Sequence, residues 1–252
     1  MYLPVQPIRP AATVILVRDC EGDYEILMLR RTRDAAFAGG MYVFPGGRVD
    51  ADDHLHRYDR YRREPSAAQI LQLLAVGDEW RGFWIAGIRE SFEEAGVFLA
   101  YDQAGRLIDH DDAETHARLE RYRHQLHAGA IGLDEICARE RLTLATDRVH
   151  FFNRWITPEG RPRRFDTRFF VAVAPPGQKG RHDAKETVDS LWIRPREALE
   201  RHDRGEFGLM AVTKRQLESL AGFNNVAELE TMILAPREYA TYRPLLPVSS
   251  DD

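Results

Sequence analysis

One short stretch of the chain, residues 89–97 (RESFEEAGV), carries three carboxylates and one arginine. On a helix, its apolar side chains gather on one side, while Glu90, Glu93 and Glu94 gather on the opposite side and point outward together. Carboxylates this close repel one another, and an ion pair between Arg89 and Glu93 relieves only part of that repulsion. The remaining charge favours a hard divalent cation such as Mg²⁺ or Mn²⁺, although a solvated helix face has the same pattern.

Glycines stand on both sides of this acidic segment. Gly46 and Gly47 directly follow a short apolar run at residues 41–44, and glycine lets the backbone approach a ligand closely. Gly96 is placed to end the helix as a C-terminal cap. We therefore expect a helix over residues 79–95 that is held between two glycine-bearing loops.

The elements that position these residues alternate irregularly between strand and helix. Hydrophobic periodicity predicts strands at residues 13–18, 24–30, 41–44, 149–156, 165–174 and 188–193. Capping signals predict helices from Ser66, over 79–95, 111–128 and 133–141, after Pro195, and at two C-terminal sites marked by Thr213 with Gln216 and Asn225 with Glu228. The helix after Ser66 should bury Ile70, Leu73 and Leu74. This order is typical of a mixed sheet covered by helices.

Composition narrows the functional classes. The chain has 252 residues, with 35 Lys and Arg against 40 Asp and Glu, so the basic excess of a nucleic-acid-binding protein is missing. No apolar run approaches the ~20 residues that span a bilayer. Cys20 and Cys137 exclude a disulfide framework but leave a single bridge open. We expect one cytoplasmic domain over residues 1–252 that binds neither nucleic acid nor membrane.

The acidic segment resembles the second half of the Nudix box, Gly-x5-Glu-x7-Arg-Glu-U-x-Glu-Glu-x-Gly-U, where U is a bulky apolar residue. Every specified position of that half is matched, by Arg89, Glu90, Phe92, Glu93, Glu94, Gly96 and Val97, and Phe44-Pro45-Gly46-Gly47 matches the usual start of the first half. The resemblance implies a fold of the α/β or α+β class: a Nudix-type α/β/α sandwich with a mixed β-sheet, extra helical insertions and C-terminal helices. It also implies a metal-dependent hydrolase that cleaves the diphosphate linkage of a nucleoside diphosphate derivative.

The spacing within the box departs from the family pattern. The family places its Arg 14 residues after its Gly, whereas Arg89 lies 42 residues after Gly47, so 28 residues are inserted. The first Glu of the box, which is mainly structural in the family, is therefore unassigned. Counting forward from Gly47 gives Asp53, and counting back from Arg89 gives Arg81.

An insertion at this place is similar to a Nudix subgroup that includes the peroxisomal coenzyme A and acyl-coenzyme A diphosphatases. Residues 37–43, 164–170 and the two C-terminal helices also resemble that subgroup. Arg31, Thr32 and Gly40 fit the spacing of a bacterial coenzyme A diphosphatase signature, but Ala36 stands where its second Arg belongs. The preferred substrate is coenzyme A or acyl-coenzyme A. An ADP-ribose or dinucleotide pyrophosphatase is the alternative, and a non-catalytic ligand-binding Nudix domain is a third hypothesis, against which the three intact carboxylates argue.

The resemblance implies a role for each residue of the box. Glu90 and Glu94 would be the main ligands of Mg²⁺ or Mn²⁺. Glu93 would be a further ligand or would orient the site through Arg89, and the carbonyl of Gly46 would add a backbone oxygen.

Outside the box, the family often places its general base on a loop near the last strand. Glu186 is the candidate for this base, and Asp189 is the second choice. Substrate contacts are expected from Arg31, Phe37 and Arg168, with Arg30 as a further cation that could meet phosphate.

Three segments account for the length beyond a minimal Nudix domain: residues 51–78 inside the box, the helical stretch 110–141 and the C-terminal helices at 205–236. Segment 51–78 could be a lid, a contact of a homodimer, or a satellite helix on the core. We expect these segments to decide substrate choice.

Overall fold

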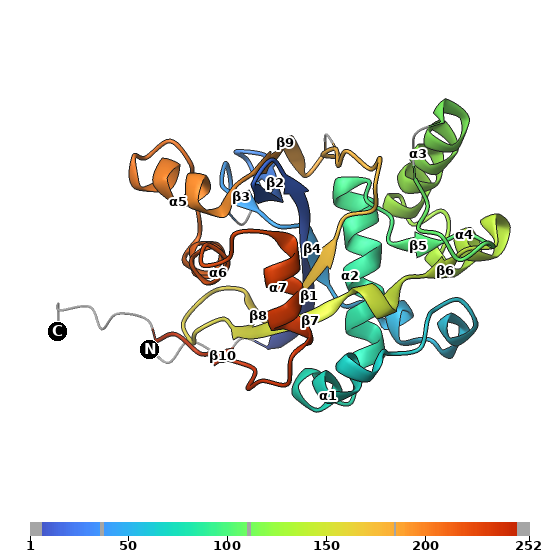
Figure 1. Ribbon diagram of the computed structural model, residues 1–252, viewed down its shortest axis with the longest axis horizontal. Helices are drawn as coiled ribbons and strands as arrows, with labels where there is room; N and C mark the ends of the chain where they lie inside the picture. The colour runs from blue at the N-terminus through green and yellow to red at the C-terminus, as the bar shows by residue number, and fades with distance from the viewer. Residues whose placement is uncertain (1–6, 36–37, 110–111, 184, 246–252) are drawn as a thin grey trace.

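The computed structural model describes residues 7–35, 38–109, 112–183 and 185–245. In these residues a mixed sheet of eight strands has the order β10-β7-β8-β1-β2-β3, with β4 also paired to β1 and β9 to β2 (Figure 1). β1 and β8 run parallel, as do β7 and β10, and the other pairs are antiparallel. The strands are β1 (Ile8–Cys20), β2 (Asp23–Arg31), β3 (Tyr42–Val43), β4 (Gly46–Arg48), β7 (His150–Ile156), β8 (Arg164–Val173), β9 (Thr187–Ile193) and β10 (Thr241–Tyr242).

Helices cover both faces of this sheet. They are α1 (Ala67–Val76), α2 (Trp80–Ala95), α3 (Ala113–His127), α4 (Leu133–Glu140), α5 (Pro195–Asp203), α6 (Ala211–Leu220) and α7 (Val226–Leu234), with short 3₁₀ turns η1 (Ala51–His54), η2 (His56–Arg60) and η3 (Thr146–Arg148). A separate pair, β5 (Ala100–Tyr101) and β6 (Thr143–Leu144), lies near α3 and α4. The expected α/β/α sandwich with extra helices is confirmed.

Strand β1 shows how the sequence builds two cores. Successive side chains of a strand face opposite sides of the sheet. Val14 and Leu16 pack with α2 in one apolar cluster, while Ile15 and Val17 belong to a second cluster with α5, α6 and α7. Because both faces are covered, the strand is a continuous apolar run.

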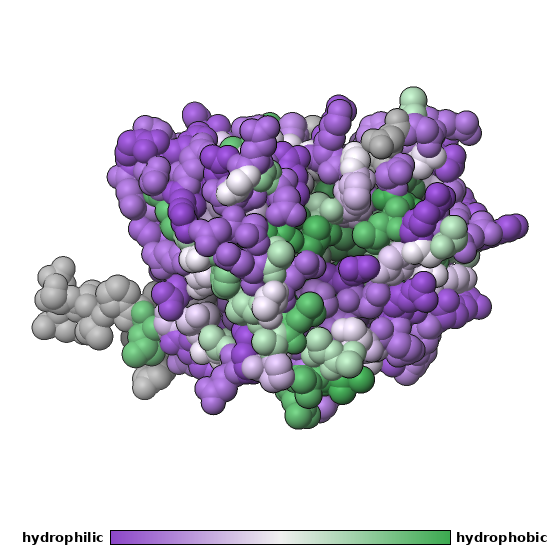
Figure 2. Space-filling view, viewed as in Figure 1, coloured by the Kyte–Doolittle hydropathy of each residue, from purple (hydrophilic) through white to green (hydrophobic). Residues whose placement is uncertain are grey.

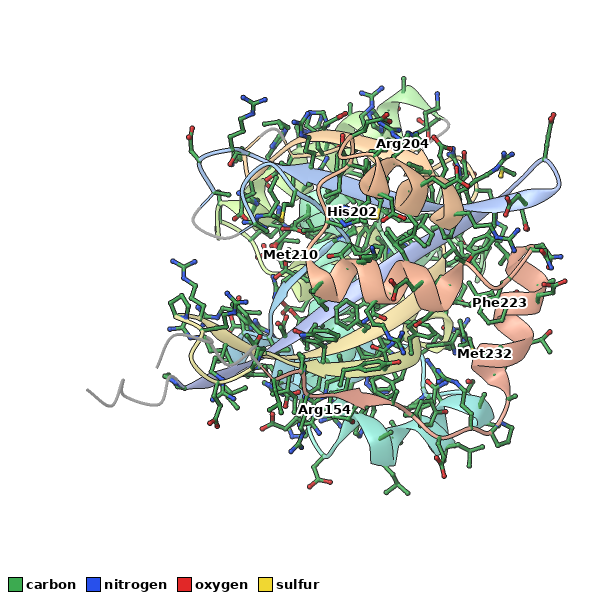
Figure 3. The ribbon with its side chains drawn as sticks, turned by 90° about the vertical axis from the view of Figure 1, so that its left-hand side faces the viewer. Arg154, His202, Arg204, Met210, Phe223 and Met232 are labelled. Carbon is green, nitrogen blue, oxygen red and sulfur yellow. The ribbon has the colours of Figure 1, made fainter. Side chains whose placement is uncertain are left out.

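Figure 3 views the second layer, where Met210 directly precedes α6, Phe223 lies between α6 and α7, and Met232 belongs to α7. Asn225 caps α7 as predicted, and its side chain accepts a hydrogen bond from the N–H of Glu228. The proposed start of the preceding helix at Thr213 was wrong. The helix begins after Met210, so Thr213 and Gln216 lie inside α6 and do not start it. Both residues are buried, and the side-chain amide of Gln216 exchanges hydrogen bonds with Asn153 of β7.

Helix α1 begins at the predicted cap but buries the opposite face. Ser66 and Gln69 form the expected capping box. Ile70, however, is 57% exposed and Leu74 is 94% exposed, and they contribute to an apolar patch at the lower edge of Figure 2. The apolar face predicted from Ile70, Leu73 and Leu74 is therefore wrong in its orientation.

Buried glutamines explain how α1 is held. The Gln69 side-chain amide donates to the carbonyls of Thr146 and Val149 at 2.6 and 2.8 Å. Gln72 accepts from the N–H of Phe151 at 2.8 Å, so it occupies part of the backbone edge of β7. Because η3 and β7 present unpaired backbone groups here, amide side chains satisfy them where leucine could not.

The other predicted strands and helices are present, although β1 (Ile8–Cys20) is longer than the predicted 13–18 and β4, β5, β6 and β10 were not predicted. Helices α3 and α4 lie within the expected helical stretch, and Asp112 caps α3. Both cysteines are free thiols. Over the described part of the chain, every helix is too short or too polar to cross a bilayer.

Candidate active site

Two glycines bring the sheet against the acidic helix. Strand β4 pairs with β1, so that Gly46 lies opposite Thr13 and Gly47 opposite Ala12. The N–H of Gly46 donates to Glu94 Oε2 at 2.9 Å, and a Cβ added to Gly47 would lie 2.5 Å from Glu90 Oε1. In the structure these glycines approach the carboxylates of α2, and their predicted approach to a ligand stays a prediction.

Helix α2 has the orientation that its sequence predicts. Ile85, Ile88 and Phe92 are buried in the core, and the indole N–H of Trp84 donates to the carbonyl of Val149 at 2.6 Å. Gly96 ends the helix with φ of 66°, in the left-handed region that glycine readily adopts. This anchoring fixes the opposite face of α2, which carries the acidic residues, against η1 and β4.

Arg89 is the hub of the site. Its Nη1 donates to Glu90 Oε1 at 2.8 Å and to Glu93 Oε2 at 3.1 Å, which confirms the predicted pair with Glu93. Its Nε and Nη2 donate to the two carboxylate oxygens of Asp53, both at 2.9 Å. One planar guanidinium therefore fixes three carboxylates, the bidentate geometry for which arginine is suited.

Asp53 resolves the position that the spacing left open. It is 1% exposed, and it also accepts the N–H of Asp50 at 2.8 Å within η1. Arg81, the position counted back from Arg89, pairs instead with Asp59. Asp53 therefore stands where the family pattern has its first Glu, six residues after Gly47, and it contacts the arginine of the box. The unchanged spacing from Gly47 was the sequence feature that pointed to it.

The carboxylates are less exposed than the helix pattern suggests. The side chains of Glu90 and Glu93 are 12% and 14% exposed, and Glu94 is 6% exposed, because β4 and η1 cover this face of α2. Burial raises the pKa of Glu90 to about 7. Burial and the negative charge of Glu90 together hold the pKa of Glu94 well above its usual range, and burial raises the pKa of Glu93 as well.

The donor set fits a hard divalent cation. Glu90, Glu93 and Asp53 share the single guanidinium of Arg89, and carboxylate oxygens are the ligands that Mg²⁺ and Mn²⁺ prefer. Among the described residues, no three acidic, histidine or cysteine side chains are gathered closely enough to hold an ion without rearrangement. Glu90 and Glu93 turn toward Arg89 while Glu94 turns toward the Gly46 N–H, so side-chain rotation would be needed to bring them together.

Glu186 lies beside this cluster, immediately before β9. Its Oε2 is 3.3 Å from Nη2 of Arg31, and its carbonyl accepts the N–H of Thr32. Besides burial and Glu90, the pKa of Glu94 is affected by two further charges: the Arg31 guanidinium lowers this pKa and the Glu186 carboxylate raises it. Both side chains are therefore close enough to act on Glu94. The buried Nε of Arg31 has no hydrogen-bond partner in the described part of the molecule. Arg31 and Glu186 therefore share one side of the site.

A residue absent from the sequence predictions holds this loop. Asp183 accepts hydrogen bonds from the N–H groups of Lys185, Glu186 and Thr187. Burial raises the pKa of Asp183, but the hydrogen bonds from Thr187 and Glu186 outweigh it and the net pKa is lowered. Its spacing before Thr187 is typical of an Asx turn, which was the available sequence signal.

Other predicted residues lie apart from the carboxylates. Asp189, the second choice for the base, pairs in register with Arg30 on β2 and raises the pKa of Tyr42 together with burial. Phe37 lies outside the described residues.

Arg168 has a structural role within the protein. Its side chain is 9% exposed and lies over the ring of Phe83. Its Nε donates to the carbonyl of Val76 at 3.1 Å, and its Nη1 pairs with Asp166 at 2.6 Å. These contacts hold the guanidinium between β8 and the end of α1, and its contact with substrate stays a prediction.

Comparisons with known proteins agree with the geometry. The sequence model of the NUDT19 Nudix domain matches residues 71–213. The chain is 26% identical over 242 residues to acyl-coenzyme A diphosphatase NUDT19 of Xenopus laevis, which covers 84% of this chain and 63% of that protein. The Gallus gallus protein of the same name is 27% identical over 267 residues, covering 88% of this chain and 70% of the relative.

A solved structure gives an independent comparison. The crystal structure of a Nudix hydrolase from Alicyclobacillus acidocaldarius superposes with a TM-score of 0.74 at 28% identity, covering 92% of this chain and 99% of the other. The likeness thus extends through the insertions and the C-terminal helices as well as the acidic helix.

Proposed function

The chain belongs to the Nudix hydrolase family, and from that premise we propose that it hydrolyses the diphosphate linkage of coenzyme A or an acyl-coenzyme A. The observation that carries this proposal is the extent of the match. Relatives named acyl-coenzyme A diphosphatase align over 84% and 88% of this chain, and so beyond the box that all Nudix proteins share. The chain spans 63% of the length of the Xenopus relative.

We propose Mg²⁺ or Mn²⁺ as the cofactor. Glu90 and Glu94 would hold it, with Glu93 and the carbonyl of Gly46 as further ligands. The shared ion pairing supports this, because Glu90, Glu93 and Asp53 surround one guanidinium and, when ionised, exceed its positive charge. A cation bound there would neutralise phosphate charge and acidify water.

The residues around the carboxylates have separate tasks in this proposal. Arg89, held by Asp53, fixes Glu90 and Glu93 in position. Glu186 accepts the proton of the attacking water, whose oxygen forms a new bond to phosphorus as the bridging P–O bond breaks. Arg31, whose guanidinium pairs with Glu186 and whose side chain is 20% exposed, meets a phosphate of the substrate. The products would be adenosine 3′,5′-bisphosphate and a phosphopantetheine fragment.

A substrate panel tests the proposal. The full chain is incubated with Mg²⁺ and, in separate reactions, coenzyme A, an acyl-coenzyme A, ADP-ribose, NADH and diadenosine polyphosphates. We expect turnover of coenzyme A or its acyl form. Turnover of ADP-ribose without coenzyme A would establish the alternative, which the Ala36 departure favours. No turnover of any of them would favour the non-catalytic reading.

Glu94→Gln tests the site. We expect kcat to fall by about a hundredfold or more, because the site loses a metal ligand, while the melting temperature shows a folded protein. Glu114→Gln is the matched control, since the Glu114 side chain is 91% exposed on α3. Turnover near the wild-type rate in Glu94→Gln would refute the ligand assignment.

Three proposals about the whole protein remain from the sequence: one domain over residues 1–252, a cytoplasmic location and a homodimer. The exposed face of α1, with Ile70, Leu71 and Leu74, offers the dimer a candidate surface. Light scattering after size-exclusion chromatography measures the mass directly, and a monomer at micromolar concentration would contradict the dimer.

A further inference from the structure

A cavity of about 590 Å³ lies between two of the inserted segments, beside the candidate active site. One wall comes from η1 and η2, and the other from the end of α3 and the start of α4. Arg89 and Glu93 form part of the lining, so the cavity opens from the acidic cluster itself. Its volume falls within the range of small-ligand sites in proteins.

The lining excludes phosphate. Asp50, Asp52, Asp134 and Glu135 contribute carboxylates, and the cations there are already engaged. Arg57 pairs with Asp134 at 3.2 Å and with Asp52 at 3.7 Å. Arg89 is shared among the carboxylates of the site. An anionic group entering this cavity would meet net negative charge, whereas an uncharged group with N–H donors would find acceptors.

The lining also offers apolar surface. Its wall includes three buried residues, Tyr58, Leu126 and Ile131. Two exposed alanines, Ala51 and Ala130, line it from opposite sides. A ligand that is partly aliphatic and partly amide matches this mixture.

We propose that this cavity binds the acyl-pantetheine arm of the substrate, an inference that rests on the proposed function. The arm is uncharged, contains two amide N–H groups and ends in an aliphatic chain. The diphosphate would lie at Glu90 and Glu94, and the cavity begins one residue away at Glu93. The phosphate-bearing nucleotide would extend the other way, toward the ion pair of Arg31 and Glu186, which carries no net charge and so repels phosphate less than the cavity does.

The order of charges along the site thus sets the direction of the substrate. The net negative charge of the cavity opposes the reverse orientation, in which the 3′-phosphate would enter the acidic wall. A dinucleotide, whose second half bears a further base and ribose in place of the aliphatic arm, lacks the apolar part that the wall accommodates.

The test fills the cavity without touching the carboxylates. Ala130→Trp places a large ring into it from an exposed position, and Ala51→Trp does so from the opposite wall. Ala128→Trp, also exposed but outside the lining, is the matched control. For both cavity variants we expect the KM for an acyl-coenzyme A to rise by about tenfold or more, with kcat largely retained. The control should keep the wild-type KM.

A binding measurement separates the two levels of the proposal. Calorimetric titration with S-octanoyl-pantetheine, which carries no phosphate, should show binding to the wild type and to Ala128→Trp and none to the cavity variants. Wild-type turnover of acyl-coenzyme A with an unchanged KM in both folded cavity variants would overturn this inference alone. Absence of turnover by the wild-type protein would overturn the proposed function, and this inference with it.

Discussion

Glu90→Gln is expected to stabilise the metal-free protein at alkaline pH while removing its activity. The Glu90 side chain is 12% exposed, and burial raises its pKa from 4.5 to about 7. Because the folded-state pKa lies above the unfolded value, the contribution of Glu90 to stability is fully present below pH 4.5 and is lost as the pH rises through 7. Glutamine does not titrate, and its carbonyl can still accept the hydrogen bond from Arg89.

Linkage gives the size of the effect. With these two pKa values, ionisation of Glu90 costs the folded wild type about 2.5 kcal/mol more at pH 8 than at pH 5. The stability advantage of Glu90→Gln over the wild type should grow by that amount between the two pH values. This is a large fraction of the ~5–15 kcal/mol that stabilises a typical domain.

Urea unfolding in EDTA measures this difference. Both proteins are unfolded at pH 5 and at pH 8, and the free energies are compared within each pH. His150, whose pKa burial lowers to about 4, titrates equally in both proteins and cancels from the comparison. Adding Mg²⁺ at pH 8 should stabilise the wild type and leave Glu90→Gln nearly unchanged. An advantage that is the same at both pH values would refute the desolvation of Glu90, and undiminished turnover would refute its role as a ligand.

Two matched pairs of substitutions test the packing, one at β4 beside the site and one on α1. Gly47→Ala would set a methyl group 2.5 Å from Glu90 Oε1 and should lower kcat by about tenfold or more, whereas Gly222→Ala, with open space around it, should match the wild type in the same assay. Equal rates for the two would contradict the close approach at β4. On α1, Gln69→Leu removes the side-chain hydrogen bonds to the buried carbonyls of Thr146 and Val149 and the one from the N–H of Ser66, and should cost about 2 kcal/mol in urea unfolding. Leu74→Gln on the exposed face should change stability by less than about 0.5 kcal/mol. The opposite order would support the face predicted from sequence.

The layered fold could be predicted because its signals are local. The apolar strand at β1, the hairpin turn before β2 and the caps at Ser66 and Asn225 each follow from neighbouring residues. The face of α1 could not, because its partners are carbonyl groups of Thr146 and Val149, far away in the chain. Predicting the buried face of a helix from its apolar periodicity assumes that the surface it packs against is apolar. Helix α1 instead packs against the backbone groups at the edge of a sheet.

At the site, the type of each box residue was predictable and its environment was not. The helix pattern separated Glu90 and Glu94 from the core, but β4, which covers them, is only three residues long and carries two glycines. The burial of Arg168 could not be predicted for a related reason. Its partners Val76 and Asp166 come from a helix end and from its own strand, and only the fold brings them together.

The 3₁₀ turn η1 has a consequence for how this chain could have acquired its extra length. Asp53 is fixed to Arg89, and His54 lies against Gly82 in the first turn of α2, where an added Cβ would collide with its ring. The chain thus leaves the site after His54 next to the helix to which it returns at Trp80. Because the cost of closing a loop grows slowly with its length, these adjacent anchors let the intervening segment be long at little cost to the geometry of the carboxylates. The segment has in turn become part of the core, since Tyr58 and Val76 are buried there and Gln69 binds the carbonyls of Thr146 and Val149.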